Sequence, residues 1–232
     1  MKLRALVVGM GLLCSFSSFA ATELRYGLEA EYPPFESRNA SGELEGFDVE
    51  LGNAICKAAA LKCSWVETSF DALIPGLVAK KFDAINSAMN ITEQRRKSID
   101  FTQPIYRIPS QLVGKAGSAV EATPEGLKGK TICFLQGSLQ ETYAKEHWEK
   151  HGVTVVSYKD QNMAWGDLLN GRIDASLVMS AAGQAGFLSM PQGKGFGFIG
   201  KPASDDTIPS RGIGTGTRKG DEATKKQQKR KK

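Results

Sequence analysis

The residues best suited to chemistry in this chain follow directly after short apolar runs. Five such runs lead into segments with helical spacing, at residues 24–28, 64–67, 82–85, 131–135 and 173–178. The residues that follow them include Glu29, Tyr32, Phe70, Ser87, Asn90, Arg95, Gln136, Ser138 and Met179. In an open α/β sheet, the carboxyl ends of the strands line the ligand crevice. The pattern therefore predicts one crevice that binds a small molecule.

The same residues give little support to a catalytic or metal-dependent function. The chain has only two histidines, His147 and His151, so a Ser-His-Asp or Cys-His arrangement has few residues to draw on. The zinc-protease pattern requires Glu directly after its first His, and Trp148 stands there instead. Neither a phosphate loop nor a dinucleotide fingerprint occurs. We therefore predict no metal, no cofactor and no catalytic residue.

The elements that must position these residues alternate along the chain. Helical spacing of Phe47, Leu51, Ala54, Ile55 and Ala58 predicts a helix between two short strands, and residues 73–78 repeat the pattern. Such βαβ alternation is typical of an α/β fold with mostly parallel sheets flanked by helices. A proline break interrupts it at residues 107–110. We therefore expect two lobes, at residues 22–106 and 111–203, with a hinge at 107–110 and a return segment at 204–217.

The N-terminus has the pattern of a secretory signal peptide. Lys2 and Arg4 precede a short apolar stretch at residues 5–13, and Ser18 and Ala20 form a small-x-small cleavage pattern. The apolar stretch is shorter than the roughly 20 residues of a membrane-spanning helix. We therefore predict a signal peptide at residues 1–21 and an exported protein. An uncleaved anchor, or a lipoprotein signal at Cys14, is the alternative.

The C-terminus is strongly basic. Residues 218–232 carry eight Lys and Arg against two acidic residues, whereas residues 21–217 carry 20 Lys and Arg against 23 Asp and Glu. The basic isoelectric point thus belongs to this segment and not to the folded body. Because no aromatic residue interleaves with the charges, we predict a disordered tail. A polyanion-binding arm is the alternative.

The cysteines fit an oxidising compartment. Six residues separate Cys56 from Cys63, so the pair can close a local loop worth about 2–3 kcal/mol by the chain-entropy estimate. Two buried free thiols are the alternative. Cys133 lies inside an apolar strand, and we expect it to be a small core residue.

The chain also resembles a known family. Residues 46–56, with the sequence GFDVELGNAIC, are similar to the signature of the periplasmic polar-amino-acid-binding proteins of ABC importers, solute-binding protein family 3. Further similar segments lie at residues 29–35, 70–75, 91–95, 135–138 and 171–175, so the resemblance covers about residues 22–220. The branch that binds lysine, arginine, ornithine and histidine is the most similar. Its paired cysteines match Cys56 and Cys63.

The resemblance implies a two-lobed periplasmic-binding-protein (Venus-flytrap) fold and a role in transport. A cationic amino acid would bind between the lobes, which would close about the hinge. The monomer would then present its ligand to an inner-membrane ABC permease, without catalysis and without nucleic acid. A related periplasmic dehydratase uses the same scaffold. An enzyme of that kind would need a cleft acid, for which Glu29 is the one candidate.

The resemblance also implies roles for individual residues. Arg95 would hold the ligand α-carboxylate in a bidentate fork, completed by backbone N–H groups near Leu139 at a helix start. Ser87 and Asn90 would add polar contacts. The alternative for Arg95 is a surface helix arginine.

The side-chain end of the ligand would meet aromatic and acidic groups. Tyr32 and Phe70 would sandwich the ligand side chain and attract a cation through their ring faces, with core packing as the alternative. Glu29 would face the distal positive charge.

Three departures from the family pattern bear on ligand choice and stability. Met179 stands where the family has an Asp that pairs with the ligand α-ammonium, and Ala88 replaces a Ser or Thr. Because a buried ammonium without a counter-charge is costly, this predicts weak binding of a free α-amino acid, or a ligand with a substituted amine such as an opine. The basic tail also stands in place of the family's C-terminal helices, which puts the stability of the first lobe in question.

Overall fold

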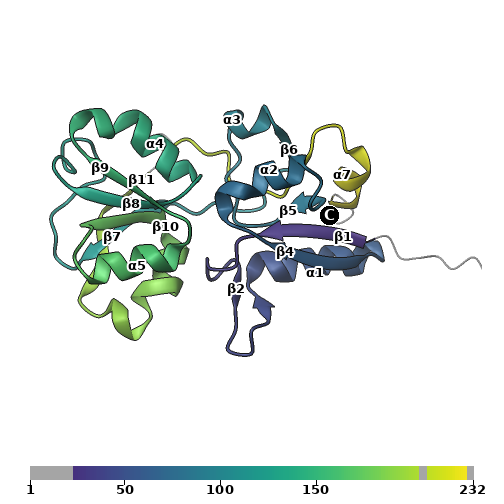
Figure 1. Ribbon diagram of the computed structural model, residues 1–232, viewed down its shortest axis with the longest axis horizontal. Coiled ribbons are helices and arrows are strands. Elements are labelled where there is room, and N and C mark those ends of the chain that lie inside the picture. The colour runs from purple at the N-terminus through teal and green to yellow at the C-terminus, as the bar shows by residue number, and fades with distance from the viewer. Residues whose placement is uncertain (1–22, 204–207, 229–232) are drawn as a thin grey trace, which may run out of the picture.

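The protein has two lobes, each built on its own five-stranded sheet (Figure 1). The computed structural model describes residues 23–203 and 208–228, so the expected signal peptide lies outside the described residues. Helices flank both sheets, and the predicted two-lobed α/β fold is confirmed. Within the described residues, no helix is both long and apolar enough to cross a membrane.

The first lobe holds a mixed sheet in the order β4-β1-β5-β12-β6. Its strands are β1 (Glu23–Leu28), β4 (Lys62–Glu67), β5 (Ala84–Ile85), β6 (Ile99–Phe101) and β12 (Gly216–Arg218). The strands β1, β4 and β5 run parallel, and β12 pairs antiparallel with both β5 and β6. A short ribbon of β2 (Ser37–Arg38) and β3 (Leu44–Glu45) extends from this lobe. Its helices are α1 (Phe47–Ala59), a 3-10 turn (Phe70–Ala72), α2 (Leu73–Val78), α3 (Glu93–Arg96) and α7 (Glu222–Gln228).

The second lobe holds a sheet in the order β11-β7-β10-β8-β9. Its strands are β7 (Ser110–Lys115), β8 (Thr131–Leu135), β9 (Thr154–Tyr158), β10 (Ala175–Met179) and β11 (Phe196–Ala203). The strands β8, β9 and β10 run parallel, whereas β7 is antiparallel to β10 and β11. The helices are α4 (Leu139–His147), α5 (Gln161–Leu169) and α6 (Ser180–Gly183), which continues into a π-helical turn (Gln184–Leu188), and there are 3-10 turns at Glu149–His151 and Pro191–Gly193.

Two segments of the chain cross between the lobes. The first leads from β6 to β7, and the second leads from β11 back to β12. They pair with each other, since Tyr106 and Ile213 form an isolated bridge and the Ile105 N–H donates to the Ile213 carbonyl at 2.8 Å. A paired double crossing of this kind is a suitable hinge, because a few backbone torsions can turn one lobe against the other.

The face of α1 that packs against the sheet is not the face predicted from the helical spacing of its apolar residues. Its buried residues are Asp48, Val49, Gly52 and Cys56, whereas Phe47 is 47% exposed. The Asp48 carboxylate points inward and accepts hydrogen bonds from the Ala88 N–H at 2.6 Å and the Tyr106 hydroxyl at 3.0 Å. Gly52 permits the close approach, because a Cβ there would lie 2.5 Å from the Trp65 ring.

The cysteines pair as predicted. Cys56, near the end of α1, and Cys63, in β4, form a disulfide with a Cα–Cα distance of 5.9 Å. The thiol of Cys133 is free and buried in the second lobe.

The prediction of a disordered tail from residue 218 is wrong for the residues that the structure describes. Arg218 ends a strand of the first sheet, and α7 follows it. Two of the basic residues form ion pairs with acids that are distant in sequence. Arg218 pairs with Asp83 at 3.2 Å, and Lys225 pairs with Asp100 at 2.6 Å. The Asp221 carboxylate accepts from the Thr224 N–H at 3.0 Å at the helix start. Residues 229–232 lie outside the described residues.

Candidate functional site

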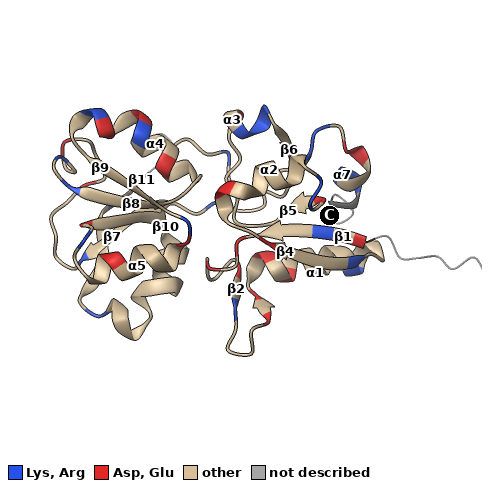
Figure 2. Ribbon diagram, viewed as in Figure 1, with Lys and Arg blue, Asp and Glu red and all other residues tan. Residues whose placement is uncertain are grey.

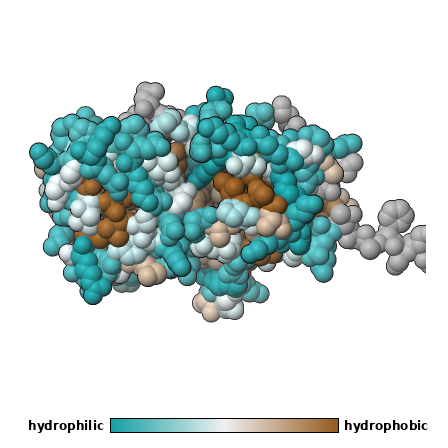
Figure 3. All heavy atoms as spheres, turned by 45° about the horizontal axis from the view of Figure 1, so that its top comes forward, coloured by the Kyte–Doolittle hydropathy of each residue, from teal (hydrophilic) through white to brown (hydrophobic). Residues whose placement is uncertain are grey.

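Three of the predicted site residues, Arg95, Tyr32 and Met179, lie along the boundary where the two lobes touch. On the face shown in Figure 3, the lobes meet along a narrow seam. Side chains of one lobe bond to the other, since Gln136 donates to Asp71 at 3.2 Å and Asn162 donates to Glu31 at 2.9 Å. One buried apolar cluster also includes residues of both lobes. The lobes are therefore in direct contact across the site.

Arg95 joins the two lobes. It lies in the short helix α3, whose cap Thr92 accepts from the Arg95 N–H at 3.1 Å. Its guanidinium donates to the Asn90 carbonyl at 2.7 Å in the first lobe and to the Gly137 carbonyl at 2.9 Å in the second. It also lies over the Phe70 ring, 5.4 Å from the centroid.

The Arg95 guanidinium has no acid partner among the described residues. Burial without such a partner lowers the pKa of Arg95 to about 10. A guanidinium has five N–H donors, so the two bonds to carbonyls leave donors for a further acceptor. This is an environment in which a carboxylate ligand would supply the missing counter-charge.

The start of α4 faces the same region. Ser138 caps the helix by accepting from the Glu141 N–H at 3.0 Å, and Leu139 is its first residue. Gly137, with φ of 77°, turns its carbonyl to Arg95 while its N–H donates to Glu141 at 2.6 Å. A hollow of about 530 Å³ next to Arg95 and Leu139 opens between the lobes, with Thr92, Thr142, Ser210 and Arg211 among its lining residues.

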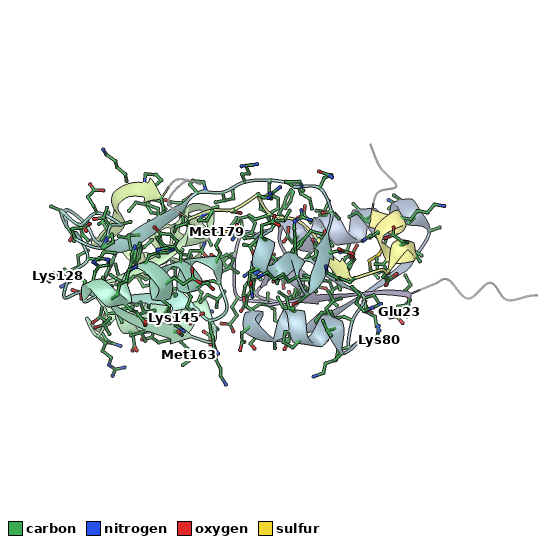
Figure 4. All side chains as sticks on the ribbon, turned by 90° about the horizontal axis from the view of Figure 1, so that it is seen from above. Glu23, Lys80, Lys128, Lys145, Met163 and Met179 are labelled. Carbon is green, nitrogen blue, oxygen red and sulfur yellow. A yellow bond between two sulfur atoms is a disulfide. The ribbon has the colours of Figure 1, made fainter. Side chains whose placement is uncertain are left out.

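Tyr32 and Phe70 are buried at the boundary, with 7% and 9% exposure. The Tyr32 hydroxyl accepts from the Met179 N–H across the boundary at 3.2 Å. Met179 ends β10 and lies on the side of the second lobe that faces the first (Figure 4). Both rings belong to the shared apolar cluster, as core packing alone would require. A sandwich around a ligand side chain stays a prediction.

Glu29 lies at the end of β1 and is only 4% exposed. Its N–H donates to Ser87 Oγ at 3.0 Å, and one of its carboxylate oxygens accepts from the Glu31 N–H at 3.1 Å. Burial, followed by the charge of Glu31, raises the pKa of Glu29 to about 8. Figure 2 shows acidic segments where β1 and β4 end beside the second lobe.

Ala88 and Asn90 hold the loop after β5 in place. Ala88 has φ of 40° and donates its N–H to Asp48, while Asn90 accepts from Arg95 through its carbonyl. The Asn90 side chain accepts from the Ser210 hydroxyl at 2.8 Å. In this arrangement Asn90 orients Arg95 and fixes the return segment, and its predicted contact with a ligand stays a prediction.

Two further acids, Glu36 and Asp48, are buried near this boundary, and no sequence pattern predicted a role for them. Burial raises the pKa of both, to about 6 for Asp48, where bonds from Ala88 and Tyr106 oppose the rise. The sequence carries one signal for such a cluster, because Glu29, Glu31 and Glu36 fall within eight residues that contain no Lys or Arg. Among the described residues, no group of three His, Cys, Asp or Glu could hold a metal ion.

A half-buried arginine and buried acids at the boundary of two α/β lobes joined by a double crossing are features of a solute-binding protein of the two-lobed class. Residues 24–230 match the bacterial extracellular solute-binding proteins, family 3, and the chain belongs to this family.

The relatives in this family bind amino acids. The chain is 44% identical to the lysine/arginine/ornithine-binding periplasmic protein of Escherichia coli K12, over 94% of this chain and 84% of that protein. It is 43% identical to the histidine-binding periplasmic protein of the same strain, over 94% and 86%. A solved structure of a Salmonella typhimurium periplasmic binding protein with high arginine specificity aligns with a TM-score of 0.82 and 31% identity, covering 90% of each chain.

Proposed function

We propose that the chain is the periplasmic substrate-binding component of an ABC-type amino-acid importer. It binds arginine, lysine, ornithine or histidine between its lobes. One observation carries the proposal: the boundary presents a half-buried guanidinium without an acid partner among the described residues, Arg95, and a buried carboxylate, Glu29. A ligand with a carboxylate at one end and a cation at the other would neutralise both groups. The names of the relatives from Escherichia coli and Salmonella support the same ligand class.

The α-carboxylate would take the free donors of Arg95 together with backbone N–H groups at Leu139. Ser87 would orient the Glu29 segment, since its hydroxyl accepts from the Glu29 N–H. Tyr32 and Phe70 would contact the aliphatic part of the ligand and attract its cationic end. Ala88, which offers no hydroxyl, would add van der Waals contact only.

The chain would act in the periplasm as a monomer, without a cofactor and without catalysis. Its partners would be the ligand and an inner-membrane ABC permease that recognises the closed lobes. Closure about the double crossing would follow ligand binding, because the Arg95 bond to Gly137 and the Tyr32 bond from Met179 form only when the lobes meet.

A second candidate ligand is an N-substituted amino acid such as an opine. Met179 favours it, because this residue is 4% exposed and offers no charge to an α-ammonium. A secondary amine with an apolar substituent could use the thioether surface instead.

Isothermal titration of the mature protein with a panel of ligands tests the proposal. The panel contains arginine, lysine, ornithine, histidine, an opine, and glutamate as an acidic control. We expect saturable binding of at least one cationic member or the opine, and none of glutamate. Absence of binding across the cationic members and the opine would refute the proposal. Conversion of a bound ligand into a product, followed by mass spectrometry, would instead support a dehydratase-like enzyme with Glu29 as its acid.

A further inference from the structure

Glu36 is a buried acid that none of the roles above uses. It follows the turn at residues 32–35 and is 1% exposed. Its backbone forms an isolated bridge with Tyr32, in which the Tyr32 N–H donates to the Glu36 carbonyl at 2.8 Å. The pairing places Glu36 directly behind the tyrosine that reaches Met179 in the second lobe.

Ser87 links Glu36 to the Glu29 segment. The Ser87 hydroxyl accepts from the Glu29 N–H at 3.0 Å and donates to Glu36 Oε1 at 2.9 Å. One hydroxyl thus joins the end of β1 to the turn that carries Glu36. Both acids lie near Tyr32. Burial raises the pKa of the Tyr32 hydroxyl, and the charges of Glu36 and Glu29 raise it further.

Glu29 and Glu36 each keep one carboxylate oxygen that has no partner. The Oε2 atom of each residue is buried and accepts no hydrogen bond from the described residues. No Lys or Arg among the described residues forms an ion pair with either carboxylate. Asp48, the third acid nearby, differs because Ala88 and Tyr106 occupy both of its oxygens. A buried carboxylate oxygen without a donor is costly, so two of them beside Tyr32 indicate a place for a cationic group.

We infer that Glu36 is a second carboxylate of the ligand site, which together with Glu29 neutralises the distal cation of the ligand. The inference rests on the proposed function and deepens it. A planar guanidinium has donors on more than one edge and can serve two carboxylates, whereas an ammonium is a single compact charge. Arginine should therefore gain more from Glu36 than lysine does.

Binding should then release protons. Burial, followed by the charges of Asp48 and Glu29, raises the pKa of Glu36 well above its ordinary value, and the pKa of Glu29 is about 8. The protein without ligand therefore favours the protonated form of both acids, and a cation favours their ionised forms. The other titratable groups that face them are Glu31, Tyr32, Asp48, Glu67, Tyr106 and Asp160.

The test is isothermal titration at pH 7 in two buffers with different ionisation enthalpies, which counts the protons released. The ligands are arginine and citrulline, which has the shape of arginine without its charge. Glu36→Gln keeps the size of the side chain and an oxygen for the Ser87 bond but cannot ionise. Glu45→Gln, at an exposed position of the β2–β3 ribbon, is the matched control.

We expect Glu36→Gln to reduce the preference for arginine over citrulline at least fivefold and to reduce proton release, while Glu45→Gln changes neither. A reduction in preference below fivefold would overturn the inference, as would an equal loss for both ligands, which marks a structural role. If Glu36→Gln does not fold by circular dichroism, the wild-type protein decides. The wild-type protein should release more than about one proton for each arginine bound, because one acid alone can release at most one proton. Release of one proton or fewer would overturn the inference. If the wild-type protein binds no cationic amino acid, the result refutes the proposed cationic ligand, and the inference about Glu36 falls with it.

Discussion

Removal of the Arg95 guanidinium is the most direct perturbation of the site. In Arg95→Ala the ligand carboxylate would lose its charge partner in a desolvated setting. The variant also deletes the donors to Asn90 and Gly137, so the bond that joins α3 to the second lobe disappears. The remaining groups at the start of α4 are backbone N–H donors, which carry no full charge.

The expected loss follows from the burial of the pair. Breaking a desolvated charge pair by removing one partner costs about 3–5 kcal/mol, which corresponds to a rise in Kd of about 150-fold to 4,000-fold. Arg95→Lys should lie between the wild type and Arg95→Ala, because an ammonium keeps the charge but cannot form the bidentate fork. The ligand-free protein should lose little stability, since the lowered pKa of Arg95 shows that its charged form is poorly compensated there.

Isothermal titration with arginine measures the change in affinity, and thermal melting without ligand measures the fold. Arg96→Ala is the matched control, because Arg96 is in the same helix but lies over Phe101, 5.8 Å from the ring centroid. It should change Kd by less than about threefold. An affinity loss below about fivefold in Arg95→Ala would remove Arg95 from the carboxylate site and refute the reasoning.

Three further predictions follow from the same structure. Met179→Asp should tighten binding of free arginine or lysine by about 1–3 kcal/mol, the scale of a charge-assisted hydrogen bond, and unchanged or weaker binding by titration would show that another group neutralises the ammonium. Replacing Cys56 and Cys63 together by Ala should lower the free energy of unfolding in urea by about 2–3 kcal/mol, and a non-reduced digest should show this pair bridged. Ligand-free protein should melt at a higher temperature at pH 5.5 than at pH 8. The pKa of Glu29 is raised to about 8 and that of Glu36 is also raised, so the folded state binds more protons than the unfolded state above the ordinary carboxyl pKa, and stability falls as pH rises toward 8. Each kcal/mol of difference in the free energy of unfolding between the two pH values should shift the melting temperature by about 2–4 °C. Bound arginine should reduce the difference between the two melting temperatures. An equal or higher melting temperature at pH 8 would contradict the titration of these acids.

The local sequence determined the order of the elements, the cysteine pair and the helix that carries Arg95. Each depends on neighbours in the chain. Thr92 caps its helix three residues before Arg95, and Cys56 and Cys63 lie seven positions apart. The strand ends were predicted less well. The apolar run was placed at residues 173–178, whereas β10 begins at Ala175 and extends to Met179, which pairs with Ser110 of the antiparallel strand β7. That extension depends on β7, which no local pattern in residues 173–178 reveals.

Only the tertiary structure decided which charges are buried and what they meet. Glu36 is buried because Ser87, 51 positions away, donates to it, and α1 turns an acid inward because Ala88 and Tyr106 bond to Asp48. Within the described part of the basic segment, Arg218 and Lys225 pair with acids more than 120 positions earlier, Asp83 and Asp100. In each case, the free energy of a charged group depends on its solvation and on partners that folding brings together, and the spacing of residues along the chain does not contain that information.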